Sequence, residues 1–270
     1  MPMSTASKWD DQTPSDPLEY AVSVRDRDVL SMVREALQTG NCRLALQPVV
    51  TAAHPRKTAF YESLIRVLDE SGRIIPAAQF MEQIEETSLG RDIDVASLQL
   101  AFHWLKTHPD MRISVNVSAR SLGDAAWRNV LNRELAQNAM RTDRMILEIS
   151  EDSAMTLPEV VIRFMEEMQP YGLAFALDDF GAGLTAFRHL KDFLFDLVKI
   201  DSLFVRNIDS DPDNQVIAEA LISVAQQFEM FAVAEGVETA REAKFLTSIG
   251  IDCLQGYHIG VPRFRINPHP

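Results

Sequence analysis

The chain has 270 residues, of which 46% are hydrophobic and 24% are charged, and 39 acidic residues outnumber 26 lysines and arginines to give a formal net charge of −13. These fractions are those of an ordinary globular protein and exclude a disordered, collagen-like or membrane-embedded chain. The negative charge argues against binding to a nucleic-acid polymer or to an anionic membrane surface. It is compatible with a small phosphorylated ligand, because divalent metals held by carboxylates can supply positive charge locally.

Cysteine usage and the chain ends bear on compartment and domain boundaries. The two cysteines, Cys42 and Cys253, lack CxxC spacing, which argues against a disulfide scaffold or a zinc knuckle. No stretch approaches the ~18 apolar residues of a membrane helix, and the N-terminus has no leader pattern, so we expect a cytoplasmic protein without a membrane segment. Residues 1–22 are predicted as a flexible polar tail, residues 23–265 as one domain and residues 266–270 as a short C-terminal tail.

Strand-like and helix-like patterns alternate along the domain. A helical pattern from about residue 24 ends before Gly40, and β-branched runs then alternate with amphipathic segments. The predicted strands are Arg43–Val49, Ala59–Ile65, Met111–Val117, Met145–Ser150, Leu173–Asp178, Leu197–Asp201, Phe231–Glu235 and Ile251–Gln255. The predicted helices after the first strand are Pro76–Thr87, Ile93–Thr107, Ala125–Asn138, Leu157–Pro170, Asn214–Phe228 and Thr239–Ile249. Eight strands with helices between most of them indicate an α/β fold, a TIM-type (β/α)8 barrel.

The first two predicted strands depart from the regular barrel pattern. Only about nine residues, including Pro55, separate them, and a parallel crossover needs a dozen or more. We therefore predict a modified barrel with an antiparallel first strand.

Polar residues gather near the ends of the predicted strands, and in a parallel barrel these carboxyl ends form the functional face. They are Glu62, Asn116, Glu148, Asp178, Asp179, Lys199, Asp201, Glu235 and Gln255. Strand alternation turns Asn116, Glu148, Lys199 and Asp201 toward the barrel interior. One such residue alone is best explained as a loop cap. So many converging carboxylates would repel one another without a cation.

The residue types indicate which cation would fit. Oxygen ligands without histidine or cysteine suit magnesium, manganese or calcium and disfavour zinc. Paired ions ~3.5 to 4 Å apart are an established arrangement for phosphodiester hydrolysis, and the adjacent Asp178 and Asp179 suit a shared ligand position. Lys199 could orient the water or offset negative charge that develops on phosphorus.

Eight motifs in this order resemble the EAL-domain family, whose members hydrolyse or bind cyclic di-GMP. The motifs are LQPVV (Leu46–Val50), ESLIR (Glu62–Arg66), NVSARSL (Asn116–Leu122), LEISE (Leu147–Glu151), LDDFGAG (Leu177–Gly183), VKID (Val198–Asp201), AEGVET (Ala234–Thr239) and LQGY (Leu254–Tyr257). The resemblance extends from about Arg25 to Pro262.

The resemblance implies roles for individual residues. It implies Glu62, Asn116, Glu148 and Asp178 as ligands of one metal, and Asp178, Asp179 and Glu235 as ligands of a second. It implies a catalytic set of Lys199, Glu235, Glu62 and Asp179. It implies substrate contacts or support by Gln47, Leu64, Arg66, Asp201, Glu238 and Gln255, with Glu151 steadying the loop after Asp179. The cofactors would be two Mg²⁺ or Mn²⁺ ions, with Ca²⁺ inhibitory, and the assembly a homodimer.

Three segments depart from the family pattern. Ser63 replaces the alanine of the signature tripeptide, and its alternation away from Glu62 predicts that it faces the helices. The loop after Asp179 reads FGAGLTAF instead of the commoner FGTGYSSL, and the VLDESGR segment after Arg66 is shortened and lacks a tryptophan. We expect a phosphodiesterase that opens cyclic di-GMP to linear pGpG. The main alternative is a cyclic di-GMP receptor without turnover that signals through a protein partner; a scaffold without the nucleotide would leave the carboxylates uncompensated.

Overall fold

The computed structural model describes residues 29–137, 139–183 and 187–265. The tails predicted at 1–22 and 266–270 lie outside the described residues, as do Leu184 and Ala186 of the loop after Asp179. Within the described part, residues 29–39 are helical, which agrees with the first predicted helix.

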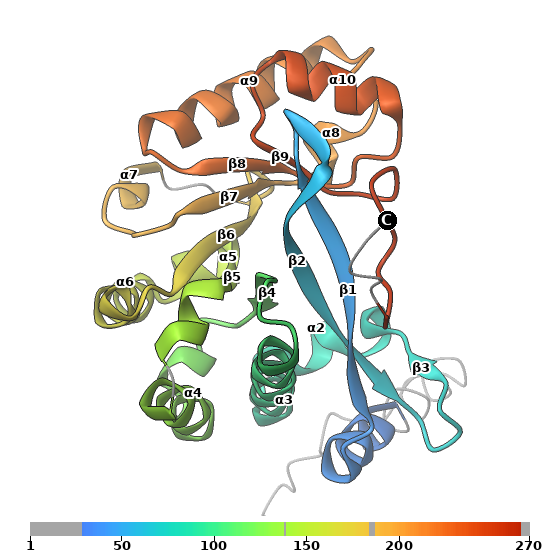
Figure 1. Ribbon diagram of the computed structural model, residues 1–270, viewed down its shortest axis with the longest axis vertical. Helices are drawn as coiled ribbons and strands as arrows, with labels where there is room; N and C mark the ends of the chain where they lie inside the picture. The colour runs from blue at the N-terminus through green and yellow to red at the C-terminus, as the bar shows by residue number, and fades with distance from the viewer. Residues whose placement is uncertain (1–28, 138, 184–186, 266–270) are drawn as a thin grey trace, which may run out of the picture.

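Eight strands close into a barrel surrounded by helices (Figure 1). In order around the barrel they are β1 (Cys42–Thr51), β9 (Cys253–Leu254), β8 (Phe231–Ala234), β7 (Leu197–Ile200), β6 (Ala174–Phe180), β5 (Met145–Ser150), β4 (Ile113–Asn116) and β2 (His54–Leu68). Strand β1 is antiparallel to both of its neighbours, β2 and β9, and the other neighbouring pairs are parallel. The modified barrel with an antiparallel first strand is therefore confirmed.

A ninth strand escaped the sequence prediction. Strand β3 (Ile74–Ile75) pairs antiparallel with the end of β2, where Val67 faces Ile75. Two residues are too few to show an alternating pattern, so nothing in the sequence marks them as a strand. The same hairpin extends β2 well beyond its predicted end at Ile65.

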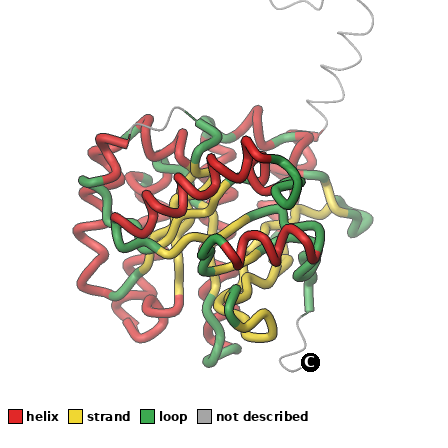
Figure 2. Tube along the Cα trace, turned by 90° about the horizontal axis from the view of Figure 1, so that it is seen from above, coloured by secondary structure: helices red, strands yellow, loops and turns green. Residues whose placement is uncertain are grey.

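The longer helices cover the outside of the barrel (Figures 1 and 2). They are α3 (Ser88–Thr107), α4 (Ala125–Gln137), α6 (Pro158–Met168), α9 (Pro212–Gln227) and α10 (Ala240–Ser248). Shorter helices are α2 (Met81–Ile84), α5 (Glu151–Thr156), α7 (Phe187–Leu190) and α8 (Ser202–Val205), with 3₁₀ turns at Ala77–Gln79, Ser121–Gly123, Ala139–Arg144 and Gln169–Tyr171.

The single helix predicted for Pro76–Thr87 is wrong. It is divided at Phe80, whose backbone (φ −139°, ψ −25°) is not helical, into a 3₁₀ turn and α2. Helix α9 begins two residues before its predicted start. Its N-cap Asp211 accepts hydrogen bonds from the backbone N–H groups of Asp213 and Asn214, and Pro212 occupies the first turn, where it needs no hydrogen bond.

The barrel interior is built in layers, as alternating strands require. A buried apolar layer consists of Val49, Phe60, Ile146, Ala176, Leu197, Val233 and Cys253. In each parallel strand of this set, the residue two positions after the apolar one points to the same face and is polar. These polar residues are Glu62, Glu148, Asp178, Lys199, Glu235 and Gln255. Strand β1 runs the other way, so its polar residue, Gln47, precedes Val49 by two. One period of strand alternation thus separates the apolar layer from a polar layer.

Candidate metal and phosphodiester site

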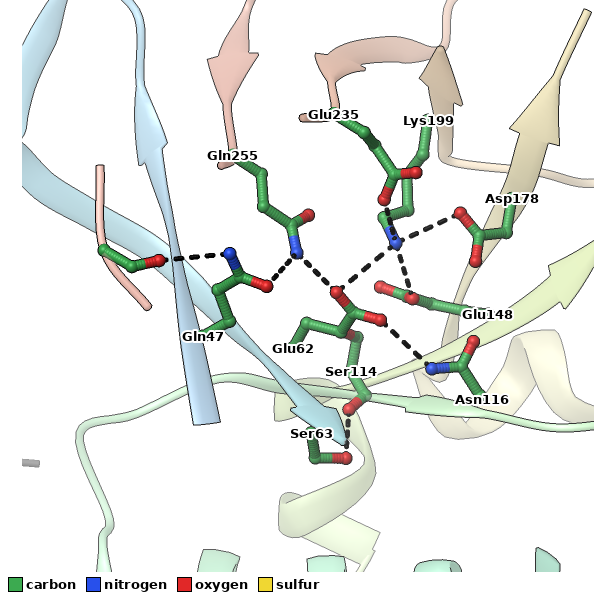
Figure 3. Close-up of polar contacts among 11 residues, drawn as sticks. Gln47, Glu62, Ser63, Ser114, Asn116, Glu148, Asp178, Lys199, Glu235 and Gln255 are labelled. Atoms are coloured by element: carbon green, nitrogen blue, oxygen red, sulfur yellow. Dashed lines mark hydrogen bonds and ion pairs between the residues drawn. The ribbon is translucent and has the colours of Figure 1, made fainter. Parts of the chain in front are cut away.

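Lys199 lies at the centre of the polar layer and is completely buried. Its Nζ is 2.6 Å from Glu235, 2.9 Å from Glu148 and 3.1 Å from Asp178, with Glu62 at 3.7 Å (Figure 3). Four carboxylates, three from strands β2, β5 and β6 and one from the residue after β8, therefore share a single ammonium group. Even with Lys199 protonated, an excess of negative charge remains if all four carboxylates are ionised.

Amide side chains hold Glu62 in this layer. Asn116 Nδ2 donates to Glu62 Oε1 at 3.1 Å, and Gln255 Nε2 donates to Glu62 Oε2. Gln47 Nε2 in turn donates to the backbone oxygen of Gly260 at 3.0 Å, which fixes the amide beside Gln255. The predicted inward orientation of Asn116 agrees with this network (Figure 3).

Burial and charge oppose each other in setting the pKa values of the cluster. Burial raises the pKa of Glu148 to about 8, with the charges of Glu62 and Asp178 adding to the rise and Lys199 opposing it. Burial also raises the pKa of Glu235 well above its ordinary value. For Glu62, by contrast, the ammonium of Lys199 and the amide hydrogen bonds outweigh burial, so the pKa is lowered.

The surrounding carboxylates keep Lys199 protonated. Burial by itself would lower the pKa of this amine, but the charges of Asp178, Glu148, Glu235 and Glu62 together raise it well above its usual value. The direction of this shift favours the protonated form of Lys199, which compensates the carboxylates in the metal-free site.

A second acidic group lies at the edge of the cluster. Asp178, Asp179 and Glu235 each offer a carboxylate oxygen, and these oxygens lie within 4.8 Å of one another. Asp179 adopts a left-handed backbone conformation (φ 56°), which is unfavourable for a residue other than glycine and common at functional sites. Burial and the neighbouring charges of Asp178 and Asp201 raise the pKa of Asp179 to about 6.

These donors fit hard divalent cations. They are carboxylate and amide oxygens, and no histidine or cysteine is among them. Oε1 of Glu148 is buried without a hydrogen-bond partner among the described residues. A buried polar oxygen without a partner is costly, and coordination of a cation would satisfy it. The donor set is therefore one that would suit magnesium, manganese or calcium.

Two cavities open on either side of the cluster. The first, of about 280 Å³, is lined among others by Arg66, Asp94, Asn116, Glu148 and Asp178. The second, of about 310 Å³, is lined among others by Gln47, Glu62, Arg206, Glu235 and Tyr257. Leu64 lines both cavities.

The other predicted contact residues lie around these cavities. Arg66 lines the first, and its Nη1 donates to the backbone oxygen of Ile65 at 3.1 Å. Glu238 is exposed and lines the second.

Asp201 directly follows the last residue of β7, Ile200, and its charge lies close enough to Asp179 to help raise the pKa of that residue. Its carboxylate also caps α8 by accepting the Leu203 N–H at 2.6 Å.

Glu151 lies beneath the loop that follows Asp179. Its side chain is buried, and Oε2 accepts the N–H of Gly181 at 3.0 Å. Gly181 has φ +94°, and a Cβ there would lie 3.0 Å from side-chain atoms of Phe204 and Leu221. The hydrogen bond between Glu151 and the Gly181 N–H is the contact that a loop-supporting role would require of Glu151.

Asp94 is a site residue that sequence reasoning missed. It lines the first cavity from α3, and its Oδ2 accepts hydrogen bonds from the Ser118 N–H at 3.0 Å and the Ser121 hydroxyl at 2.7 Å. It thereby anchors the segment that follows Asn116. Burial raises its pKa to about 6, with Glu85 adding to the rise while the two serine hydrogen bonds oppose it. The sequence signal that could have identified Asp94 was an acidic residue directly after Ile93, which faces the core from an amphipathic helix.

Glu242 was missed as well. Its Oε2 accepts the N–H groups of Glu238 and Thr239, both at 2.8 Å, and its Oε1 accepts the N–H of Asn207 at 2.9 Å. The side chain thus joins the segment after β8, which carries Glu235, to the segment after α8. The T-x-x-E spacing of Thr239 and Glu242 is a capping-box signature and would have identified it.

Ser63 faces away from the polar layer, as its alternation predicted. Its hydroxyl donates to the backbone oxygen of Ser114 at 2.5 Å, so it adds a hydrogen bond between β2 and β4 (Figure 3). The substitution of the family's alanine therefore leaves the orientation of Glu62 intact.

The fold and the site define a class of proteins, closed α/β barrels with one reversed strand and a buried lysine among carboxylates at the strand ends. Comparison with known families agrees: the model of the EAL domain matches residues 30–262. The chain belongs to the EAL-domain family. No described helix is both long enough and apolar enough to cross a membrane.

Named relatives share this domain. The chain is 29% identical over 234 residues to the cyclic di-GMP phosphodiesterase PdeR of Escherichia coli, covering 85% of this chain and 35% of the relative. It is 30% identical over 240 residues to the bifunctional diguanylate cyclase/cyclic di-GMP phosphodiesterase MucR of Pseudomonas aeruginosa, covering 87% of this chain and 35% of the relative. The chain thus spans about a third of the length of these relatives.

Solved EAL structures share the fold. The FimX EAL domain of Pseudomonas aeruginosa bound to c-di-GMP superposes with a TM-score of 0.79 at 27% identity, covering 89% of this chain and 98% of that one. The PaMucR phosphodiesterase in complex with c-di-GMP superposes with a TM-score of 0.76 at 28% identity, covering 87% and 97%.

Proposed function

We propose that this protein is a metal-dependent phosphodiesterase that hydrolyses cyclic di-GMP to linear pGpG. The observation that carries the proposal is the complete set of oxygen ligands around Lys199, placed between two cavities. Cyclic di-GMP has two phosphodiesters in a ring with one guanine on each side. A phosphodiester over the carboxylate cluster would direct one half of the ligand into each cavity.

Two divalent cations complete the proposed site. Glu62, Asn116, Glu148 and Asp178 would hold one, and Asp178, Asp179 and Glu235 the second. When bound, such ions lower the pKa of a water molecule and stabilise the oxygens that attack and leave phosphorus. Calcium, which accepts more ligands and looser geometry than magnesium, is expected to bind without supporting turnover.

The protein's own groups supply positioning and charge. Lys199 remains protonated, so it can stabilise negative charge on the phosphate or orient the attacking water without giving up its proton. Gln255 and Asn116 hold Glu62 in one orientation, which limits the reorganisation that metal binding requires. Glu151 supports the loop after Asp179 through Gly181.

Chromatographic detection of pGpG tests the proposal. Purified protein is incubated with cyclic di-GMP and Mg²⁺ or Mn²⁺, with a chelator and a Ca²⁺ sample in parallel. We expect product with Mg²⁺ or Mn²⁺ and none with the chelator. Glu62→Ala removes a metal ligand, so it should abolish hydrolysis; a wild-type rate in this variant would contradict the metal assignment.

The same experiment decides between enzyme and receptor. Binding of cyclic di-GMP by calorimetry, with no pGpG under any metal, would replace the proposal with a receptor that signals through a protein partner. In the described part of the loop after Asp179, the Gly181 N–H donates to Glu151, which is the loop-supporting contact that the proposed enzyme requires.

A further inference from the structure

The second cavity contains a cation that the proposed chemistry does not use. Arg206 is the one lysine or arginine among the residues that line it. Its side chain is exposed, and no ion pair or side-chain hydrogen bond of Arg206 occurs within the described part of the chain. We infer that Arg206 selects a guanine over an adenine in the half of the ligand that enters this cavity. This inference rests on the proposed function.

The backbone holds Arg206 firmly while its guanidinium stays free. Its N–H donates to Ser202 O at 3.0 Å, and its own carbonyl accepts Asn214 Nδ2 at 3.2 Å. These contacts tie the residue to both α8 and α9. The anchored backbone restricts the region that the guanidinium can reach, and the cost of ordering the side chain must be offset by the bonds it makes to the ligand.

The position of the cavity makes it a site for half of the ligand. Glu62, Glu235 and Gln255 of the polar layer line it, whereas Asn116, Glu148 and Asp178 line the first cavity. The cluster therefore borders both spaces, and Leu64 lines both of them. Each cavity also has one arginine in its lining, Arg66 in the first and Arg206 in the second.

The chemistry of the bases gives Arg206 its selectivity. Guanine presents two acceptors, N7 and O6, that a guanidinium can engage together, whereas adenine replaces O6 with the N6 amino donor. A guanidinium has donors only, so it cannot accept from that amino group. A glutamine, with one donor and one acceptor, matches adenine instead.

Tyr257 supplies a flat surface in the same cavity. Its side chain is 70% exposed although the residues before it are buried. Its position is fixed by Gly256, which has φ +153° and where a Cβ would lie 2.2 Å from the Val237 oxygen. Tyr257 and Arg206 line the same cavity, and an exposed aromatic ring is suited to stacking on a base.

Arg206→Gln tests the inference with three probes: cyclic di-GMP, the mixed cyclic GMP-AMP and cyclic di-AMP. Dissociation constants and kcat and KM are measured for the wild type and the variant. We expect Arg206→Gln to weaken binding of cyclic di-GMP by roughly 10-fold or more. The preference of the protein for cyclic di-GMP over the adenine-containing ligands should become smaller or reverse. Turnover at saturation should change less than KM.

Arg133→Gln is the matched control. Arg133 is exposed on α4 and lines neither cavity. Its substitution by glutamine therefore removes the same positive charge as Arg206→Gln without removing the proposed contact. It should leave both affinity and base preference unchanged. Tyr257→Ala, in turn, should weaken all three ligands by a similar factor, because stacking does not depend on hydrogen-bonding groups.

The outcomes are distinguishable. If Arg206→Gln weakens the three ligands equally, Arg206 contacts phosphate and the inference is overturned. Unchanged affinities overturn it as well. If the wild type binds cyclic di-GMP without hydrolysing it, the dissociation constants still test the inference although the proposed enzyme has failed. If the wild type binds none of the three ligands, both the inference about Arg206 and the proposed function are overturned.

Discussion

The two layers of the barrel interior use the same strands for opposite purposes. The apolar layer that includes Phe60 and Ile146 is closely buried and needs no partner groups. The polar layer two residues away buries Lys199 among carboxylates whose pKa values are displaced in both directions. Burial therefore stabilises the first layer and costs free energy in the second, where only charge compensation recovers it.

The difference between the two layers predicts which residues of the barrel determine stability and which determine activity. Loss of volume from the apolar layer should affect folding and leave the chemistry of the remaining folded molecules largely intact. Loss of charge from the polar layer should affect both, because the same carboxylates that need Lys199 for compensation are the proposed metal ligands.

Lys199→Met should have the largest effect. It leaves Glu148, Glu235 and Asp178 without their shared cation, so in metal-free buffer we expect a loss of about 3 to 5 kcal/mol in the free energy of unfolding. Mg²⁺ or Mn²⁺ should restore part of it, whereas hydrolysis of cyclic di-GMP should stay about 100- to 1,000-fold slower. Urea denaturation with and without metal, and pGpG formation, measure the two effects. Equal stability of variant and wild type without metal would show that Lys199 does not compensate the carboxylates.

Ile146→Ala tests the apolar layer on the same strand as Glu148. Truncation of this buried side chain should cost about 3 kcal/mol of unfolding free energy, from lost burial and the cavity left behind. The rate per folded molecule should fall by less than about threefold, in contrast to Lys199→Met. Urea denaturation gives the first value, and active-site titration with pGpG detection gives the second. A rate loss as large as that of Lys199→Met would show that the two layers are not separable.

Asp94→Asn should change how the stability of the protein depends on pH. The pKa of Asp94 is raised from 3.8 to about 6 in the folded protein, so its contribution to stability is fully present below pH 3.8 and is lost as pH rises through about 6. The wild type should therefore lose about 2 kcal/mol more than the variant between pH 4 and pH 7, since one pKa unit corresponds to about 1.4 kcal/mol. Urea denaturation of both proteins at the two pH values measures this difference. Parallel pH profiles would contradict the raised pKa.

Ser63→Ala should have the smallest effect. The variant has the family's residue and loses one buried hydrogen bond to Ser114, worth about 1 kcal/mol. Metal affinity and the rate of hydrolysis should change by less than about twofold, because Glu62 keeps its own partners, Asn116 and Gln255. Thermal unfolding and calorimetric metal titration check this. A tenfold loss of metal affinity would place Ser63 among the residues that position the site.

The sequence alone determined most of the strands and the parity of the polar layer. Period-two alternation placed Asn116, Glu148 and Lys199 on interior faces, and the short connection near Pro55 required an antiparallel first strand. Both inferences depend on local geometry only, and both agree with the structure. The strand β3 and the division of the helix at Phe80 were not predictable, because each depends on a few residues whose conformation the neighbouring chain decides.

Only the tertiary structure decided how the polar residues meet. Closure of the barrel brings carboxylates from β2, β5, β6 and the segment after β8 around the ammonium group of Lys199 on β7. Burial raises the pKa values of Glu148 and Glu235, whereas the charge of Lys199 and the amide hydrogen bonds lower that of Glu62. Asp94 and Glu242 act through loops distant in sequence, and the cavity with Arg206 exists only where α8 lies beside the segment after β9. Local sequence determines which face a side chain occupies, because alternation is a property of a single strand. Which charges become neighbours is a property of the closed barrel.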